Sequence, residues 1–278
     1  TAEAWMDGDS SWHTSSAYST HVGNTNATAM NISSMKVYDE LLQALGDREA
    51  YPNLRKLLVV GFSAGGQFVQ RYALGGVAPD ALEARGVRVR FAALSPSSLA
   101  YLDDARPVRP PRSAASCAFC DQAHIVGQTY EFAVPNSSSC PAWDVWKFGL
   151  GELNNYMYEE HGDDIAAMVT GYGNRTVLYG VGENDHFNDD INTTLGCAAD
   201  YPGDSGLDSS CGADLQGYCR LERTVAFFHY VHQYLPRVYG FDPNGHQLMV
   251  VPDFGHCPCG LLQSSSMRTV FRELFEPS

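Results

Sequence analysis

The chain is 278 residues long, 44% of its residues are hydrophobic, and its formal net charge is −14 at pH 7. This length suits one large α/β domain with a substantial core, so we predict a single domain over residues 1–278. The acidic balance and the lack of a Lys/Arg-rich block argue against a nucleic-acid partner, because binding to a phosphate backbone requires a basic face. No apolar run approaches the ~20 residues of a transmembrane segment. The first residues also lack the basic and apolar regions of a signal peptide, which is typical of a processed or truncated chain.

The first part of the chain alternates between predicted helices and strands after an irregular start. Residues 1–32 are rich in Ser, Thr, Asn and Gly and are predicted to be irregular, except for a short candidate strand that ends near Met6. Apolar residues then recur at helical spacing and predict a helix that is capped by Ser33 or Ser34 and ends at Gly46. Strands are predicted over residues 56–60 and 87–94, and helices over residues 64–74 and 79–85.

Residues 99–170 do not follow this alternation of strands and helices. They contain several prolines and a cluster of aromatic residues between Trp143 and Tyr158, and we predict that they form an inserted cap or lid. The aromatic side chains either pack the insertion onto the domain, which is the plainer interpretation, or line an apolar substrate pocket. Regular structure returns with strands predicted over residues 176–181 and 247–251 and helices over residues 221–234 and 261–275.

The residues Gly61-Phe62-Ser63-Ala64-Gly65 form a G-x-S-x-G motif between a predicted strand and a predicted helix. In this setting a serine lies on a strained strand-to-helix turn and presents its hydroxyl as a nucleophile. Gly61 and Gly65 then allow strand and helix to approach closely, because a larger side chain would collide. A structural turn is the alternative, but the strand before the motif and the helix after it favour Ser63 as a catalytic nucleophile.

A serine nucleophile needs a histidine that takes its proton and an acid that orients the histidine. In open parallel sheets such groups gather at the C-terminal ends of strands, in the chain order Ser, acid, His. Among the nine histidines, His256 follows the last predicted strand and precedes the terminal helix, so we predict that it is the general base. His186 is the main rival. Of the others, His229 and His232 lie inside a predicted helix, and four lie outside any strand end: His13, His21, His124 and His161.

The acid is expected in the polar loop that follows the strand over residues 176–181. Asp185 lies at the depth in this loop where the acid belongs, and we predict that it orients His256. Glu183, Asp189 and Asp190 remain alternatives, because an acidic loop is usually solvated and spacing does not decide which carboxylate turns inward.

Acyl transfer also requires donors for the negative charge that develops on the carbonyl oxygen. The N–H of Ala64, at the start of the predicted helix, supplies one donor of this oxyanion hole. The second normally follows an earlier strand, but residues 1–62 contain no convincing early hairpin or HGGG-type segment. Either the chain is a fragment, or Gly8–Trp12 takes the place of this loop.

The order of Ser63, Asp185 and His256 resembles the α/β-hydrolase superfamily, over roughly residues 33–275. A narrower resemblance, to an uncharacterised branch of secreted-type serine hydrolases, rests on residues 63–67, 70–72 and 211–217 and on Arg220 before a helix. The resemblance implies an α/β-hydrolase fold, with a mostly parallel sheet flanked by helices, a Ser-His-Asp triad and no particular substrate. The superfamily's first strands and oxyanion loop have no evident counterpart, so we expect an N-terminally truncated version.

Eight cysteines and several acceptor triplets for N-glycosylation together indicate a secreted glycoprotein with disulfide bonds. The alternative is that Asn, Ser and Thr simply populate polar loops. The triplets begin at Asn26, Asn31, Asn136, Asn174 and Asn192. The disulfide candidates are Cys117, Cys120, Cys140, Cys197, Cys211, Cys219, Cys257 and Cys259.

Two pairs of these cysteines lie close together in the sequence, where a structural disulfide must be distinguished from a redox motif or a metal site. Cys117 and Cys120 have the spacing of a redox motif, but their Pro/Ser-rich surroundings favour a structural bridge. Cys257 and Cys259 flank the predicted base, where disulfides would pin the His256 loop. We do not expect either of these two to bind a metal ion.

The leading hypothesis is a serine hydrolase that cleaves a carboxylic ester or related acyl substrate, small or lipid-like, through an acyl-enzyme and without a cofactor or metal. The alternative is a catalytically impaired secreted remnant or binding protein that kept Ser63 but lacks a complete oxyanion hole. A peptidase or acyltransferase with the same triad is not distinguished from an esterase, because leaving-group preference depends on the shape of the pocket. The sequence indicates neither acyl-chain length nor oligomeric state.

Overall fold

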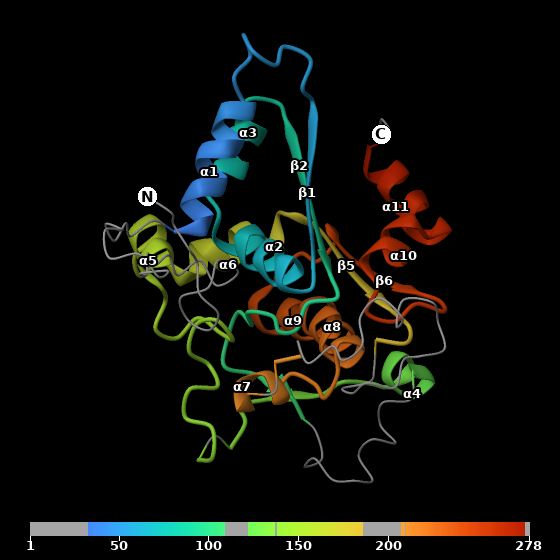
Figure 1. Ribbon diagram of the computed structural model, residues 1–278. Helices are drawn as coiled ribbons and strands as arrows, with labels where there is room; N and C mark the ends of the chain where they lie inside the picture. Colours follow the sequence, from blue (N-terminus) through green and yellow to red (C-terminus); the bar gives the residue numbers. More distant parts are fainter. Residues whose placement is uncertain (1–32, 109–121, 137, 186–206, 209, 276–278) are drawn as a thin grey trace, which may run out of the picture.

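A computed structural model shows the arrangement of the chain (Figure 1). It describes residues 33–108, 122–136, 138–185, 207–208 and 210–275. Residues 1–32, with the candidate strand near Met6, lie outside the described part. None of the described helices is long and apolar enough to cross a membrane.

The core of the fold is a parallel four-stranded sheet with the strand order β1-β2-β5-β6. Its strands are β1 (Lys56–Phe62), β2 (Arg88–Leu94), β5 (Thr176–Gly182) and β6 (His246–Val251), which confirms the four predicted strands. The register pairs Val59 with Phe91, and Leu178 with both Ala92 and Gln247. Because every pair is parallel, the C-terminal ends of all four strands lie at one edge of the sheet.

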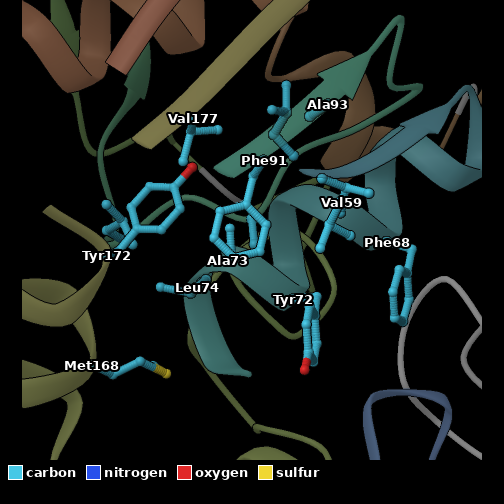
Figure 2. Close-up of a cluster of buried hydrophobic side chains, with 14 of the residues drawn as sticks. Val59, Phe68, Tyr72, Ala73, Leu74, Phe91, Ala93, Met168, Tyr172 and Val177 are labelled. Atoms are coloured by element: carbon cyan, nitrogen blue, oxygen red, sulfur yellow. The ribbon is translucent and has the colours of Figure 1, made fainter. Parts of the chain in front are cut away.

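One face of the sheet is covered by α2 (Ala64–Gly75), α6 (Ile165–Gly173) and α8 (Arg220–His229) (Figure 1). The core on this side is strongly aromatic (Figure 2). Phe91 and Val177 of the sheet belong to the same buried cluster as Tyr72 of α2 and Tyr172 of α6. The apolar residues of β2 alternate in direction, since Phe91 and Ala93 face this cluster whereas Ala92 and Leu94 face the other side of the sheet.

The opposite face is covered by two C-terminal helices, α10 (Pro258–Gln263) and α11 (Ser265–Phe275). Leu261 and Met267 pack there against Leu178 and Val251. The prediction of one helix over residues 261–275 was wrong, because the helix is interrupted at Ser264. The Ser264 hydroxyl accepts a hydrogen bond from the N–H of Met267 at 3.1 Å and so starts a second helix.

The remaining predicted helices are present with small differences. The helix predicted after Ser33 is α1 (Ser34–Leu45), which Ser33 caps through a 3.1 Å hydrogen bond and which ends at Gly46. The helix predicted over residues 79–85 is α3 (Ala78–Ala84). The helix predicted over residues 221–234 continues as α8, then η4 (Tyr230–Tyr234, a π-helical turn) and then α9 (Leu235–Tyr239). Pro236 does not interrupt it because proline is tolerated in the first turn of α9.

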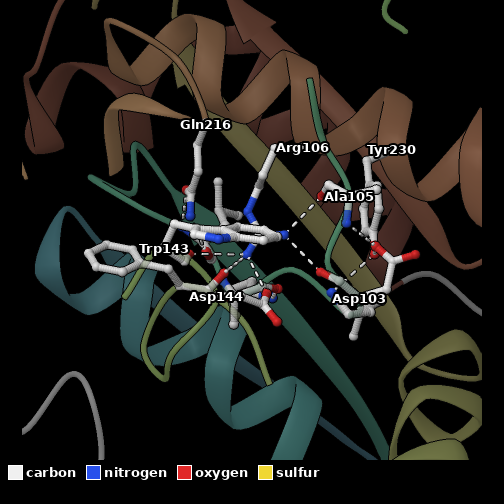
Figure 3. Close-up of polar contacts among 12 residues, drawn as sticks. Asp103, Ala105, Arg106, Trp143, Asp144, Gln216 and Tyr230 are labelled. Atoms are coloured by element: carbon white, nitrogen blue, oxygen red, sulfur yellow. Dashed lines mark hydrogen bonds and ion pairs between the residues drawn. The ribbon is translucent and has the colours of Figure 1, made fainter. Parts of the chain in front are cut away.

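The segment predicted as an insertion contains α4 (Gln122–Gly127), α5 (Asn155–His161) and a short antiparallel pair, β3 (Arg106–Pro107) with β4 (Phe132–Ala133). Arg106 is buried and ties its two halves together (Figure 3). The guanidinium donates to the carbonyl of Asp103 at 2.7 Å, and to the Asp144 carboxylate at 2.8 Å and the Phe148 carbonyl at 3.0 Å. Trp146 and Tyr156 of the segment are buried in the main hydrophobic cluster, so the packing interpretation holds for these two aromatic side chains, whereas the role of the segment as a cap stays a prediction.

Candidate active site

Ser63 occupies the sharp turn between β1 and α2. Its backbone has φ 56° and ψ −117°, a region that a non-glycine residue adopts only at a cost. A Cβ atom at Gly61 would lie 2.2 Å from the carbonyl oxygen of Gly65, so strand and helix approach as closely as predicted. The N–H of Ser63 donates to the carbonyl oxygen of Leu94 in β2 at 2.8 Å, which anchors the turn to the neighbouring strand.

His256 lies in the loop between β6 and α10, and its ring bridges two predicted site residues. Its Nε2 atom is 3.0 Å from the hydroxyl oxygen of Ser63. Its Nδ1 atom is 2.9 Å from Oδ2 of Asp185. The structure therefore brings together three side chains that the sequence separates by up to 193 residues, at the C-terminal ends of β1, β5 and β6.

Asp185 follows β5 and is almost completely buried, with 3% of its surface exposed. Burial alone would raise the pKa of this carboxyl group, but the hydrogen bond from His256 and the positive charge of Arg220 hold the pKa below its ordinary value. The carboxylate is thus an ionised acceptor, so that Nδ1 of His256 carries a proton and donates it. Nε2 is then left with a lone pair that faces the Ser63 hydroxyl.

The loops that carry the acid and the histidine are joined through Phe254. The N–H of Asn184 donates to the Phe254 carbonyl at 2.8 Å. A Cβ atom at Gly182 would lie 2.2 Å from the same oxygen, so only glycine fits there. The ring of Phe62, next to the serine, lies 4.5 Å from the His256 ring. These contacts fix the position and the orientation of the His256 ring.

The structure also places some of the rival candidates. The Glu183 carboxylate accepts a hydrogen bond from the N–H of Asp253 at 2.9 Å, which is a structural contact in the adjoining loop. His161 bonds the Gly75 carbonyl, and His232 bonds the His246 carbonyl, both through Nε2. His124 lies in α4 and His229 in α8. His13, His21, His186, Asp189, Asp190 and Gly8–Trp12 lie outside the described residues.

Ala64 is the first residue of α2, where the leading N–H groups of a helix have no intrahelical acceptor. Its amide follows Ser63 directly, in the position expected of an oxyanion donor. The partial positive charge of the helix N-terminus favours an anion at the same place.

Sequence reasoning gave no role to a set of buried polar side chains around the loop after β2. Gln216 both donates to the Leu99 carbonyl at 2.7 Å and accepts from its N–H at 2.8 Å. Gln70 holds Ala100 in the same two-sided way, at 3.1 and 2.9 Å. Both glutamines belong to the motifs on which the narrower resemblance rests. Gln70 could have been noticed as a polar residue within the predicted helix over residues 64–74, whereas Gln216 lies in a turn and gives no such signal.

Two of the candidate cysteines, Cys140 and Cys211, form a disulfide bond with each other. It joins the insertion to α7 (Cys211–Asp214). Cys257 is also disulfide-bonded. The prediction was wrong for Cys219, a buried thiol whose sulfur accepts from the Glu222 N–H, and for Cys259, an exposed free thiol. Cys117, Cys120 and Cys197 lie outside the described residues.

Comparison with solved structures gives relatives of this architecture. The poly(3-hydroxybutyrate) depolymerase LpqC from Bordetella parapertussis superposes with a TM-score of 0.50 at 18% sequence identity. The match covers 98% of this chain and 66% of the depolymerase. The chain has an α/β-hydrolase fold.

A second solved structure gives a weaker match. Poly(aspartic acid) hydrolase-1 from Sphingomonas sp. KT-1 gives a TM-score of 0.46 at 17% identity, over 94% of this chain and 70% of that protein. No protein-family model matches the chain, and no curated protein matches its sequence. The chain spans slightly less than two thirds of the length of the depolymerase, so the likeness concerns the fold.

Proposed function

We propose that the protein is a serine hydrolase that cleaves carboxylic esters or related acyl substrates. The single observation that supports this function best is the unbroken line of hydrogen bonds from Asp185 through His256 to Ser63. This line ends at a serine whose backbone is held in a strained conformation, as in a nucleophile elbow.

In the proposed mechanism, the Ser63 oxygen attacks the substrate carbonyl while Nε2 of His256 takes its proton. The negative charge that forms on the carbonyl oxygen is stabilised by the N–H of Ala64 at the start of α2. His256 then gives the proton to the leaving group, and an acyl-enzyme remains on Ser63. Water, activated by the same imidazole, hydrolyses the ester and restores the serine.

Asp185 has two tasks in this sequence. Its hydrogen bond to Nδ1 fixes the tautomer that leaves Nε2 free to accept a proton. Its negative charge stabilises the imidazolium that forms when Ser63 attacks. Because the carboxylate is buried, solvent screens this interaction weakly.

A fluorophosphonate probe tests the proposal directly. Wild-type protein should be labelled at Ser63, and S63A should not be labelled, because the probe reacts with an activated serine hydroxyl. S265A is the matched control, since Ser265 is exposed on α11 and should leave labelling unchanged. Absence of labelling in folded wild-type protein, or equal labelling of S63A, would contradict the proposed function.

We also infer that the protein matures in an oxidising compartment and carries N-linked glycans. The Cys140–Cys211 disulfide supports the compartment, and the exposed side chains of Asn136 and Asn174 are accessible to modification. Intact-mass measurement of protein from a eukaryotic secretory host, before and after enzymatic removal of N-glycans, tests the inference. An unchanged mass would contradict glycosylation.

A further inference from the structure

Arg220 occupies a position that is unfavourable for an arginine in two respects. It is the first residue of α8, where the helix dipole disfavours a cation. Its side chain is also only 2% exposed, and burial of a guanidinium costs free energy unless the charge is paired. A residue that violates two local rules requires a compensating interaction, and such positions are often functional.

The carboxylate of Asp185 is one compensating group. Nη1 of Arg220 lies 3.7 Å from Oδ1 of Asp185, and both side chains are 2% exposed. The other oxygen of the same carboxylate, Oδ2, binds His256. The main chain adds a second link, because the N–H of Leu221 donates to the Asp185 carbonyl at 2.9 Å. One carboxylate is therefore held between a permanent cation and the imidazole.

The start of α8 is itself fixed in place. The carboxylate of Glu222 accepts a hydrogen bond from the N–H of Tyr218 at 2.8 Å, while the N–H of Glu222 donates to Cys219. The arrangement is similar to a capping box, except that the carboxylate accepts from the residue before the N-cap Cys219 and not from Cys219 itself. The guanidinium of Arg220 therefore approaches Asp185 from a helix end that cannot easily shift.

The next cation along α8 has partners of its own. Arg223 donates to the Ser97 carbonyl and to the Gly217 carbonyl, and it pairs with Asp214 at 3.1 Å. Asp208 adds a further negative charge near Arg223. Asp185 is therefore faced by His256 from the loop before α10 and by Arg220 from α8, while Arg223 has separate acidic partners.

We propose that Arg220 is a positioning residue of this site, which keeps Asp185 ionised and turned so that Oδ2 faces His256. The proposal rests on the proposed hydrolytic function of Ser63. The cation also opposes a second positive charge on the neighbouring imidazole. It therefore favours the neutral imidazole, which is the form that accepts the Ser63 proton.

The variants R220M and R220K separate charge from shape. Methionine keeps much of the length of the side chain but removes the charge. Lysine keeps the charge but lacks the planar guanidinium group. R175M is the matched control, because Arg175 is a buried cation paired with Asp80 at 2.6 Å, outside the site. The histidine ring signals are followed by NMR against pH, with the His256 signal assigned from its loss in H256N.

Removing the positive charge favours proton uptake by the Asp185–His256 pair, whichever member holds the proton. In R220M the midpoint of this uptake should rise by about one pH unit, and the acid limb of kcat/KM for p-nitrophenyl acetate should rise with it. R220K should keep both within a few tenths of a unit of wild type, as should R175M, even where R175M is less stable. An unchanged midpoint in R220M, or an equal shift in R175M, would overturn the proposal.

A second comparison decides the question where R220M alone does not fold. D185N/R220M replaces both members of the buried pair, which proteins tolerate better than the loss of one. If Arg220 acts through Asp185, the fluorophosphonate labelling rate of D185N/R220M should equal that of D185N. A further loss of at least tenfold would show that Arg220 acts elsewhere. If wild-type protein does not react at all, the proposed function fails, whereas the NMR titration still tests the role of Arg220.

Discussion

Two histidines lie at opposite ends of β6, and each has hydrogen bonds on both sides of its ring. His246 begins the strand, where Nδ1 lies 2.8 Å from the Tyr179 hydroxyl and Nε2 lies 3.1 Å from the Tyr172 carbonyl. His256 follows the strand, between Asp185 and Ser63. Both rings thus have a polar partner at each nitrogen, but the partners differ in kind.

The difference is in charge and in access. His246 is 2% exposed and has neutral partners, and burial lowers its pKa to about 4. The His256 side chain is 17% exposed, and one of its partners is an ionised carboxylate. An imidazole can exchange a proton with a substrate only when a counter-charge stabilises its charged form and one nitrogen can be reached. Under the proposed function, His246 is a structural histidine held by neutral groups, and His256 is a base because a carboxylate accompanies it.

The largest expected effect comes from removing that carboxylate. D185N replaces the ionised acceptor with a neutral amide, which favours the wrong tautomer of His256, and kcat for ester hydrolysis should fall by about 10⁴. E183Q is the matched control, because Glu183 lies in the same loop and bonds the Asp253 N–H instead. Steady-state kinetics with p-nitrophenyl esters measures both. A loss smaller than tenfold in folded D185N would show that the charge does not distinguish the two histidines.

The second prediction concerns His246 and has the opposite character, since it affects stability. The pKa of His246 is near its ordinary value of 6.5 in the unfolded chain and about 4 in the folded one. The unfolded chain therefore binds the proton first, and stability should fall as the pH decreases from about 6.5 to about 4, by about 3 kcal/mol in total.

The variant H246Q isolates this contribution, because glutamine does not titrate. Urea unfolding of wild type and H246Q at several values between pH 7 and pH 4 should show the stability advantage of wild type shrinking as the pH falls. A constant difference between the two proteins across this range would contradict the prediction.

Sequence reasoning located His256 and missed the importance of His246 for physical reasons. The position of His256 follows from topology, because the C-terminal ends of parallel strands converge and the chain order selects the candidates. His246 stands one residue before the predicted strand over residues 247–251, and nothing in periodicity shows that it is buried. The same limit applied to Arg220, whose partner Asp185 is 35 positions away in the chain and meets it only through tertiary packing.

The fold shows a similar division. Strands and their following helices were predictable because apolar period and capping residues are local signals, as at Ser33 and Gly46. The break between α10 and α11 was not, because it depends on the buried hydroxyl of Ser264. Asp185 was chosen among the acidic residues of its loop only by its position after the strand. Glu183, in the same loop, accepts a hydrogen bond from the N–H of Asp253 instead, so its carboxylate has a different partner.

The smallest effect should come from Y179F, and it tests whether the two ends of β6 are independent. Because Nε2 of His246 donates to the Tyr172 carbonyl, Nδ1 is an acceptor, and the Tyr179 hydroxyl donates to it. Removing this hydroxyl leaves a buried nitrogen without its donor and should lower the free energy of unfolding by about 1–2 kcal/mol. Y158F, at an exposed tyrosine, should leave stability unchanged.

The rate at which a fluorophosphonate labels Ser63 should be the same in wild type, Y179F and Y158F, because His256 keeps both of its partners. Slower labelling of Y179F would mean that the buried tyrosine and His246 support the reactive end of the sheet, and the separation of the two histidines into a structural and a reactive one would no longer hold.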